Sequence, residues 1–207
     1  MTTRFAGVLV TPGMAAAAPV GTDRSAFLSA VAEDVYELLA GLESVTPVLV
    51  TAVPGLEEIT WPGTPVIDVA GEPDPVRAGF AGMAGLGAAD ADPQAVLVAA
   101  DAPDLPALLI GKLFRGLGGR EVAICPDQRG APVALAARLP LPGWVEVGFE
   151  TDQALVRLRA AAPGPRRVYA GPGWHRLREP ADLRRLDVGL EGWEQTRALL
   201  GGAPLSR

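Results

Sequence analysis

Short apolar runs alternate with segments of helical spacing through the first 125 residues. Residues 5–10 (FAGVLV) are followed by Thr-Pro-Gly at 11–13, which marks the end of a buried strand. The run AVLVAA at 95–100 has no polar alternation, as is typical of a central parallel strand covered on both faces. Over 24–41 the apolar residues recur at helical spacing behind Asp23, a preferred N-cap residue. This part of the chain predicts strands over 5–10, 47–52, 65–69, 95–100 and 121–125, and helices over 24–41, 75–87 and from an Asp104 cap to about Leu117.

The second half of the chain departs from this alternation. Extended segments are expected over 132–139, 145–149 and 166–170, a helix over 151–161, and mostly helical structure from 180 to 200. Alternating strands and helices favour a right-handed crossover between parallel strands. We therefore expect an α/β fold with a doubly wound, mostly parallel, Rossmann-like sheet and a more irregular C-terminal part. The four glycines at 79, 82, 85 and 87 weaken the predicted helix there, but they permit close packing.

The composition limits the function classes. With 207 residues, 49% of them hydrophobic, the chain is expected to form one domain with one core. The net charge of -6 argues against a nucleic-acid partner, because phosphate neutralisation needs a surplus of Lys and Arg. The single cysteine, Cys125, is expected to be a buried small hydrophobe. The sequence shows neither a signal-peptide pattern nor an apolar run long enough to span a membrane, so a cytoplasmic location without membrane contact is expected.

Asp101 is the first candidate site residue, because it directly follows the predicted central strand 95–100. Ligands of open α/β sheets bind beyond the carboxyl ends of the strands. A carboxylate there can hold Mg²⁺ or Mn²⁺ against a diphosphate, with Asp104 as a second ligand. The alternative is structural: Asp101 forms an Asx-turn and Asp104 caps the following helix.

Three stretches carry a resemblance to a known group of enzymes. VLVAADAPDLPALLIGKLFRGL (96–117) resembles the selenodomain-associated transferase 1 proteins, whose pattern is an apolar strand, Gly-Ser/Thr-Asp-x-Pro-x-Leu and a helix. ETDQAL (150–155) and WHRLREPADL (174–183) are similar to that family's Ser-Thr-Asp-x-Val-Leu and Trp-Tyr-Asp-Val-Asp-Thr-Pro-Glu-Asp-Leu. CPDQRG (125–130) is similar to the Ala-Pro-Asp-Arg-x-Gly of 2-phospho-L-lactate guanylyltransferases. The resemblance covers most of 95–187 and is much weaker before it.

Both families belong to the GT-A-like group of nucleotide-diphospho-sugar transferases and nucleotidyltransferases. The resemblance implies a three-layer α/β/α domain over 1–207, with a nucleotide-binding half (1–125) and an acceptor-side half (126–207). It implies a metal at Asp101, and a place for Asp152 facing the acceptor as a catalytic residue. The alternative is that Asp152 is an ordinary cap at the start of a helix. Thr11 and Gly13, in the loop after the first strand, and Arg77 are further candidates for nucleotide binding, since backbone amides and guanidinium groups bind phosphate. Arg77 can equally be a solvated residue in the first turn of its helix.

Two departures from the family pattern concern charge. The loop after the first strand reads TPGMAAAAPVGTD and has no Lys or Arg, although the families carry a basic loop there. The family's Asp-Val-Asp is Arg176-Leu177-Arg178 here, which reverses the local field. Three interpretations stay open: the arginines bind phosphate in place of a metal, the site has lost its activity, or the arginines are ordinary surface charges. His175, the only histidine, is expected to pack or to lie at the rim of the site.

The function predicted from these features is a nucleotide-dependent group transfer, glycosyl or nucleotidyl. Its partners would be a nucleotide or nucleotide sugar and a small acceptor. The alternative is a catalytically inactive relative that binds a nucleotide or a protein partner, and it is favoured by the absent basic loop and by the two arginines.

Overall fold

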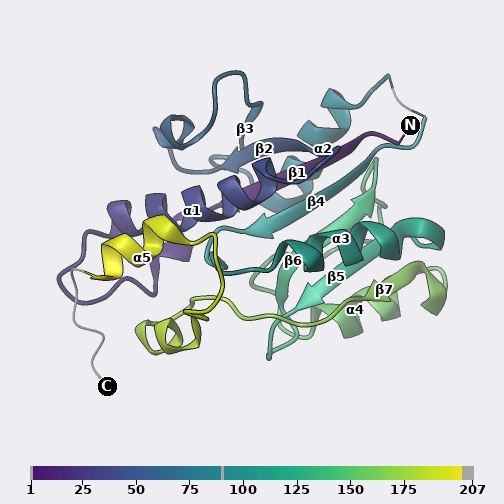
Figure 1. Cartoon of the computed structure of the whole chain (residues 1–207). Helices are drawn as coiled ribbons and strands as arrows, with labels where there is room; N and C mark the ends of the chain where they lie inside the picture. The colour runs from purple at the N-terminus through teal and green to yellow at the C-terminus, as the bar shows by residue number, and fades with distance from the viewer. Residues whose placement is uncertain (1, 90, 202–207) are drawn as a thin grey trace.

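A seven-stranded sheet runs through the centre of the molecule (Figure 1). The structure is a computed structural model that describes residues 2–89 and 91–201. Its strands follow the order β3-β2-β1-β4-β6-β5-β7, and each pair of neighbours is parallel except where β6 lies between β4 and β5. The strands are β1 (Arg4–Val10), β2 (Thr46–Thr51), β3 (Val66–Asp68), β4 (Gln94–Ala99), β5 (Val122–Pro126), β6 (Pro132–Arg138) and β7 (Val168–Ala170).

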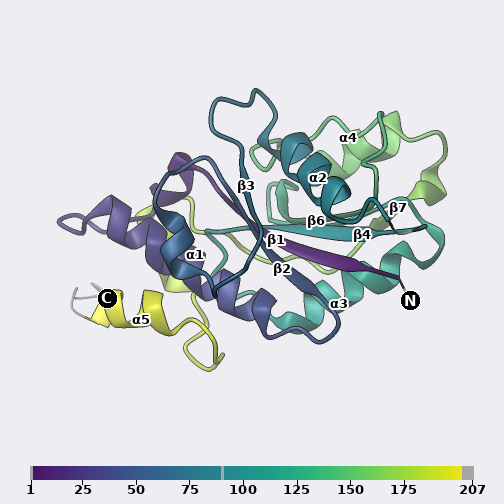
Figure 2. The same ribbon diagram turned by 90° about the horizontal axis from the view of Figure 1, so that it is seen from above.

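Helices cover both faces of the sheet, which confirms the predicted doubly wound α/β class. In Figure 2, α2 and α4 lie on one side of the sheet and α1, α3 and α5 on the other. Every strand predicted in the first half is present within one or two residues of its expected bounds. The helices are α1 (Arg24–Ala40), α2 (Pro75–Leu86), α3 (Ala107–Gly116), α4 (Ala154–Ala161) and α5 (Glu194–Gly201).

The reversed strand β6 has a simple cause in the connection that precedes it. Only residues 127–131 join β5 to β6, whereas a crossover between parallel strands needs a dozen residues or more. The connection is closed by Asp127, whose Oδ1 accepts the amides of Arg129 and Ala131 at 2.8 and 2.9 Å. Gly130 supplies the positive φ of 78° that the turn requires.

The glycines of α2 bring this helix close to the sheet. A Cβ on Gly79 would lie 2.9 Å from Val50 Cγ1 of β2 and 3.2 Å from Leu97 Cδ1 of β4. A Cβ on Gly82 would lie 2.6 Å from Ile67 Cδ1 of β3. These two glycines therefore serve close packing, as the sequence suggested.

Several expectations for element ends are wrong. Asp104 does not cap α3, which begins at Ala107 with Pro106 in the N-cap position. Residues 145–149 form no strand, and α4 starts at Ala154 behind Gln153 rather than at Thr151. The expectation of mostly helical structure between 180 and 200 is confirmed: the chain forms a 3-10 helix, Pro180–Arg185, and α5, with a non-helical connection between them.

The C-terminal helix α5 docks on α1 through one buried carboxylate. Asp34 of α1 accepts the backbone N–H groups of Gln195 and Thr196, at 2.9 and 2.8 Å, in the first turn of α5. These donors have no partner within their own helix, so Asp34 acts as its cap from a distance. Across the part of the chain that the structure describes, no helix combines the length and the apolar character needed to span a membrane.

Candidate functional site

The carboxyl ends of β1 and β4 lie side by side at the centre of one sheet edge. The Ala100 amide donates to the Leu9 carbonyl at 3.0 Å, so Thr11 and Asp101 follow neighbouring strands. The loops that follow β1 and β4 therefore open side by side at this edge, on the way to α1 and α3. The carboxyl ends of the strands are the usual ligand-binding place of an open α/β sheet. Thr11 and Gly13 lie in the loop there, and the Thr11 side chain makes no capping bond to the short 3-10 helix Pro12–Ala15.

The segment after β7 crosses the ends of β5 and β4 and delivers the two arginines. The Trp174 amide donates to the Pro126 carbonyl at 3.0 Å, and the Leu177 amide donates to the Asp101 carbonyl at 2.7 Å. Gly173 makes this crossing possible, because a Cβ there would lie 2.9 Å from the Pro126 oxygen. Leu177 is fully buried, and alternation along the extended chain directs its neighbours Arg176 and Arg178 away from it, toward the same group of oxygens.

Asp101 and Arg176 form a buried, bidentate ion pair. Arg176 Nε donates to Asp101 Oδ1 at 2.7 Å, and Nη2 donates to Oδ2 at 2.9 Å. The Arg176 side chain is 1% exposed, and the Asp101 side chain is 2% exposed. The interpretation of Arg176 as an ordinary surface charge is therefore wrong, and Asp101 uses both oxygens for the guanidinium rather than for an Asx-turn.

Arg176 and Arg178 converge on one carboxylate, that of Glu150. Arg176 Nη2 donates to Glu150 Oε1 and Arg178 Nη1 donates to Glu150 Oε2, both at 2.9 Å. Both arginines also donate to the Phe149 carbonyl, at 2.6 and 3.0 Å. Glu150 is 71% exposed, whereas Arg176 is buried and Arg178 is 18% exposed. We call the two guanidinium groups of Arg176 and Arg178 the arginine fork.

The protonation of the buried pair follows from burial and attraction acting against each other. Burial raises the pKa of Asp101 above its ordinary value, and the Arg176 guanidinium opposes this rise. Burial lowers the pKa of Arg176, but attraction to Asp101 and Glu150 outweighs it, so the pKa of this guanidinium is raised. Arg176 therefore remains charged.

Two further carboxylates position Arg178. Asp127 Oδ2 lies 3.4 Å from Arg178 Nε, and Asp182 Oδ2 accepts the Arg178 backbone amide at 2.9 Å. Asp182 also pairs with Glu179 in a reciprocal capping box at the start of the 3-10 helix. The PADL part of the C-terminal motif thus fixes the backbone that carries the fork.

Asp104 is buried and ties the C-terminal segment to the end of β4. Its Oδ1 accepts from Trp174 Nε1 at 3.2 Å and lies 3.0 Å from His175 Nε2. Its Oδ2 accepts the Asp187 amide at 3.0 Å. His175 stacks on Trp174 with ring centroids 4.9 Å apart, and it is 15% exposed, which agrees with a packing role.

Asp101 and Asp104, as arranged here, do not fit a divalent cation. Both oxygens of each carboxylate already lie within 3.2 Å of a nitrogen of this chain. Within residues 2–89 and 91–201 the structure brings together no group of three or more His, Cys, Asp or Glu side chains suited to a metal. A cation at Asp101 would have to displace Arg176.

Two predicted site residues lie apart from the fork. The Arg77 guanidinium donates to the Val145 carbonyl, and its Nε lies 3.7 Å from Asp74 Oδ2 at the start of α2. Asp152 is exposed just before α4. Neither makes a hydrogen bond or ion pair with Asp101 or the fork in the described part of the chain.

Glu150 and Asp127 were missed by reasoning from the sequence. Both lie inside the stretches that resemble the transferase families, at 150–155 and 125–130. The signal was a charge balance: two new arginines in the place of two acids require new acidic partners if they are buried.

Comparison with solved structures agrees with this architecture. A protein from Desulfovibrio desulfuricans G20, assigned as a nucleotide-diphospho-sugar transferase, superposes with a TM-score of 0.68 at 18% identity over 98% of each chain. A 4-diphosphocytidyl-2C-methyl-D-erythritol synthase superposes with a TM-score of 0.58 at 16% identity, over 89% of this chain and 97% of that one. A CMP:2-keto-3-deoxy-manno-octonic acid synthetase, solved with CTP, superposes with a TM-score of 0.53 at 13% identity, over 97% of this chain and 99% of that one.

The chain has the fold of nucleotide-diphospho-sugar transferases and cytidylyltransferases. No protein-family model matches the sequence, and a search of curated proteins finds no significant relative. At these identities the likeness establishes the fold of this transferase-like domain, and its chemistry has to be argued from its own residues.

Proposed function

We propose that this chain is a nucleotide-dependent transferase that binds the donor's phosphates with the arginine fork. The observation that carries the proposal is the convergence of Arg176 and Arg178 on both oxygens of one exposed carboxylate. Guanidinium groups bind phosphate oxygens with the same planar, paired geometry that they use for carboxylates. Glu150 therefore occupies the position that suits a phosphate of the ligand.

Glu150 is held so that a ligand can displace it. Its side chain is 71% exposed and can rotate into water, whereas Arg176 is fixed by Asp101 and Phe149. A phosphate that replaces Glu150 restores a hydrogen bond to each guanidinium. A nucleoside diphosphate or triphosphate has the negative charge needed to compete with a single tethered carboxylate.

The place of the fork suits group transfer. It lies beside the end of β4 and the turn between β5 and β6. The neighbouring end of β1 carries the loop with Thr11 and Gly13, which can meet the rest of a nucleotide. Positive groups at that place neutralise the charge of a leaving diphosphate, and the protein otherwise orients the acceptor. The cytidylyl-type fold and the motifs shared with selenodomain-associated transferases support a nucleotide donor, and Asp152 is the proposed residue on the acceptor side.

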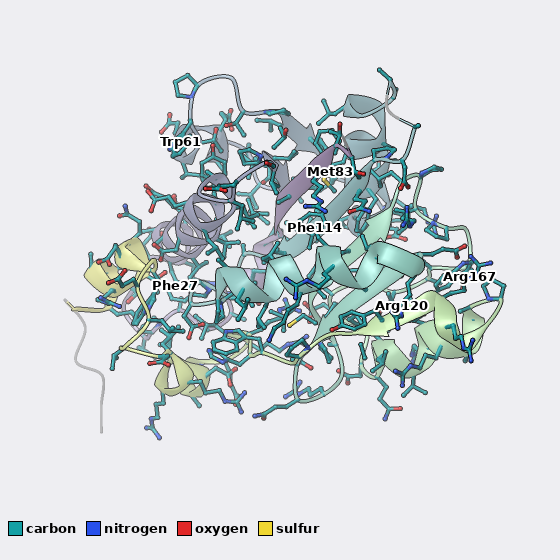
Figure 3. The ribbon with its side chains drawn as sticks, turned by 45° about the vertical axis from the view of Figure 1, so that its right-hand side comes forward. Phe27, Trp61, Met83, Phe114, Arg120 and Arg167 are labelled. Atoms are coloured by element: carbon teal, nitrogen blue, oxygen red, sulfur yellow. The ribbon has the colours of Figure 1, made fainter. Side chains whose placement is uncertain are left out.

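A thermal-shift panel of nucleoside triphosphates and nucleotide sugars, with Mg²⁺ and with EDTA, tests this proposal. A ligand of the native state raises the melting temperature, and we expect a nucleotide to do so in both conditions. Arg178→Ala should remove the shift. Arg167→Ala is the matched control, because Arg167, labelled in Figure 3, pairs with Glu121 at 2.8 Å at the amino end of β7, whereas the fork lies at the carboxyl ends of the strands. If no nucleotide stabilises the protein in either condition, the transferase proposal fails.

One observation favours the second candidate, a catalytically inactive binding relative. The carboxylate expected to hold the donor's metal is fully engaged by Arg176. ³¹P NMR of a bound nucleotide sugar or triphosphate with candidate acceptors separates the two. Release of free nucleotide or pyrophosphate supports transfer, whereas an unchanged spectrum of a bound nucleotide supports the inactive relative.

A further inference from the structure

Every hydrogen-bond acceptor of the Arg176 guanidinium is an oxygen atom, and its Cζ also lies 5.7 Å from the centroid of the Phe149 ring. The guanidinium donates to both oxygens of Asp101, to the Phe149 carbonyl and to Glu150 Oε1, over distances of 2.6 to 2.9 Å. Two carboxylates and a backbone carbonyl are the ligand types that a hard divalent cation selects. Here the same oxygens surround a cationic side chain of the protein.

We infer that the Arg176 guanidinium takes the place of a divalent cation at Asp101, so that this edge of the sheet holds a permanent cationic group of its own and works without Mg²⁺ or Mn²⁺. The inference stands on the geometry of the pair and does not depend on nucleotide binding. The guanidinium remains charged at every physiological pH, whereas a metal ion exchanges with solvent.

The replacement of a metal ion by the Arg176 guanidinium explains the charged residues that surround Asp101. A metal beside Asp101 would be repelled by the fork, which adds two positive charges at this place. The three carboxylates of Asp101, Glu150 and Asp127 instead pair with the two guanidinium groups of Arg176 and Arg178. With the guanidinium removed, the backbone of Asp101 would stay joined to that of Leu177, so Asp101 would keep its place.

Substituting Arg176→Asp tests the inference directly, with Mn²⁺ as the probe and no nucleotide present. The substitution removes the built-in cation and adds a carboxylate to the oxygens of Asp101, Glu150 and Phe149. Electron paramagnetic resonance of free Mn²⁺ should then show one bound ion, held at least roughly tenfold more tightly than by the wild type. The double variant Asp101→Asn/Arg176→Asp should lose this gain.

Two results would overturn the inference. One is wild-type protein that binds Mn²⁺ and loses it on Asp101→Asn, because the guanidinium would then not have replaced the cation. The other is a folded Arg176→Asp protein that binds Mn²⁺ no better than the wild type.

The Arg176→Asp protein brings two buried carboxylates together, so circular dichroism with and without Mn²⁺ accompanies the measurement. Folding that requires Mn²⁺ supports the inference. If the variant stays unfolded in both conditions, Arg176→Asn replaces it, since asparagine offers an oxygen ligand without a charge. A folded Arg176→Asn protein with a Mn²⁺ site that depends on Asp101 supports the inference, and one without such a site overturns it.

Discussion

At the scale of single residues, burying Asp101 with Arg176 removes two charges from water. Desolvation of such a pair can exceed the attraction gained, so the pair itself adds little net stability. Removing one partner is different, because it leaves the other charge buried and unpaired. The pair is therefore best understood as a device that fixes Arg176 for the fork.

Asp101→Asn should lower the free energy of unfolding by about 3–5 kcal/mol, because Arg176 stays buried without its ion-pair partner. The double variant Asp101→Asn/Arg176→Met should recover most of this loss. Urea denaturation measures both. Arg167→Ala, which breaks an exposed pair, should cost at most about 1 kcal/mol. An Asp101→Asn protein as stable as the wild type would show that the two charges are not coupled as described.

Cys125 should be chemically inert in the native protein. Its side chain is 1% exposed, and burial raises the pKa of the thiol to about 12, so almost no thiolate is present near neutral pH. Titration with a thiol reagent at pH 8 should give no reaction until denaturant is added. Rapid labelling without denaturant would contradict the burial of β5 at this residue.

At the scale of elements, close packing decides where glycine is needed. Gly79 of α2 faces Val50 and Leu97, which are both fully buried and cannot move aside, whereas a Cβ added to Gly85 would have nothing within 4 Å. Helix propensity alone would favour alanine at both positions.

Gly79→Ala should destabilise the protein by about 1–3 kcal/mol, because overpacking outweighs the gain in propensity. Gly85→Ala in the same helix should stabilise it by up to about 1 kcal/mol. Chemical denaturation of the two variants is a matched comparison. Equal effects of the same sign would mean that α2 does not lie as close to the sheet as described.

The docking of α5 should depend on pH through Asp34. Burial raises the pKa of this carboxyl from 3.8 to about 6. The folded state thus favours the protonated form, so the contribution of Asp34 to stability is fully present below pH 3.8 and is lost as the pH rises through about 6.

Thermal unfolding of the wild type and of Asp34→Asn across pH 3.5–7.5 isolates this contribution, because the side chain at position 34 of the variant has no titratable group. The melting temperature of the wild type should fall relative to that of Asp34→Asn as the pH rises between about 4 and 6. A difference that is constant, or that grows in favour of the wild type, would contradict the account of this contact.

At the scale of the whole molecule, the layered fold could be predicted from the sequence and the site only in part. Apolar runs such as 95–100 identified the strands, because a buried parallel strand needs side chains that suit two apolar faces. The antiparallel direction of β6 could be predicted too, since the five residues between β5 and β6 cannot make a crossover to a parallel strand. Asp101 was placed correctly at the end of β4 for the same reason.

The carboxylates that pair with Arg176 could not be predicted from the sequence. Arg176 is 75 residues from Asp101 and 26 from Glu150, and which carboxylates meet it depends on how the segment after β7 crosses two strand ends. Helical patterns did not reveal that Asp104 is used by Trp174 and Asp187 instead of by α3. Local propensity gives no information on such tertiary bonds.

Removal of the tethered competitor should strengthen phosphate binding. Glu150→Ala frees the fork, so a nucleotide that stabilises the wild type should stabilise this variant more at equal ligand concentration. Glu146→Ala is the control, because Glu146 is also exposed and lies in the same segment. Thermal shift measures both, and a weaker shift for Glu150→Ala would show that Glu150 helps to hold the ligand rather than competing with it.

The central claim is that the arginine fork of Arg176 and Arg178, rather than a metal, binds a nucleotide's phosphates. Isothermal titration calorimetry tests this claim. The wild type is titrated, first in EDTA and then in Mg²⁺, with the nucleotide that raises its melting temperature most in the thermal-shift panel. We expect binding in EDTA with a dissociation constant within about threefold of that in Mg²⁺, and loss of binding in Arg178→Ala. Binding that occurs only with Mg²⁺, or that survives Arg178→Ala unchanged, would contradict it.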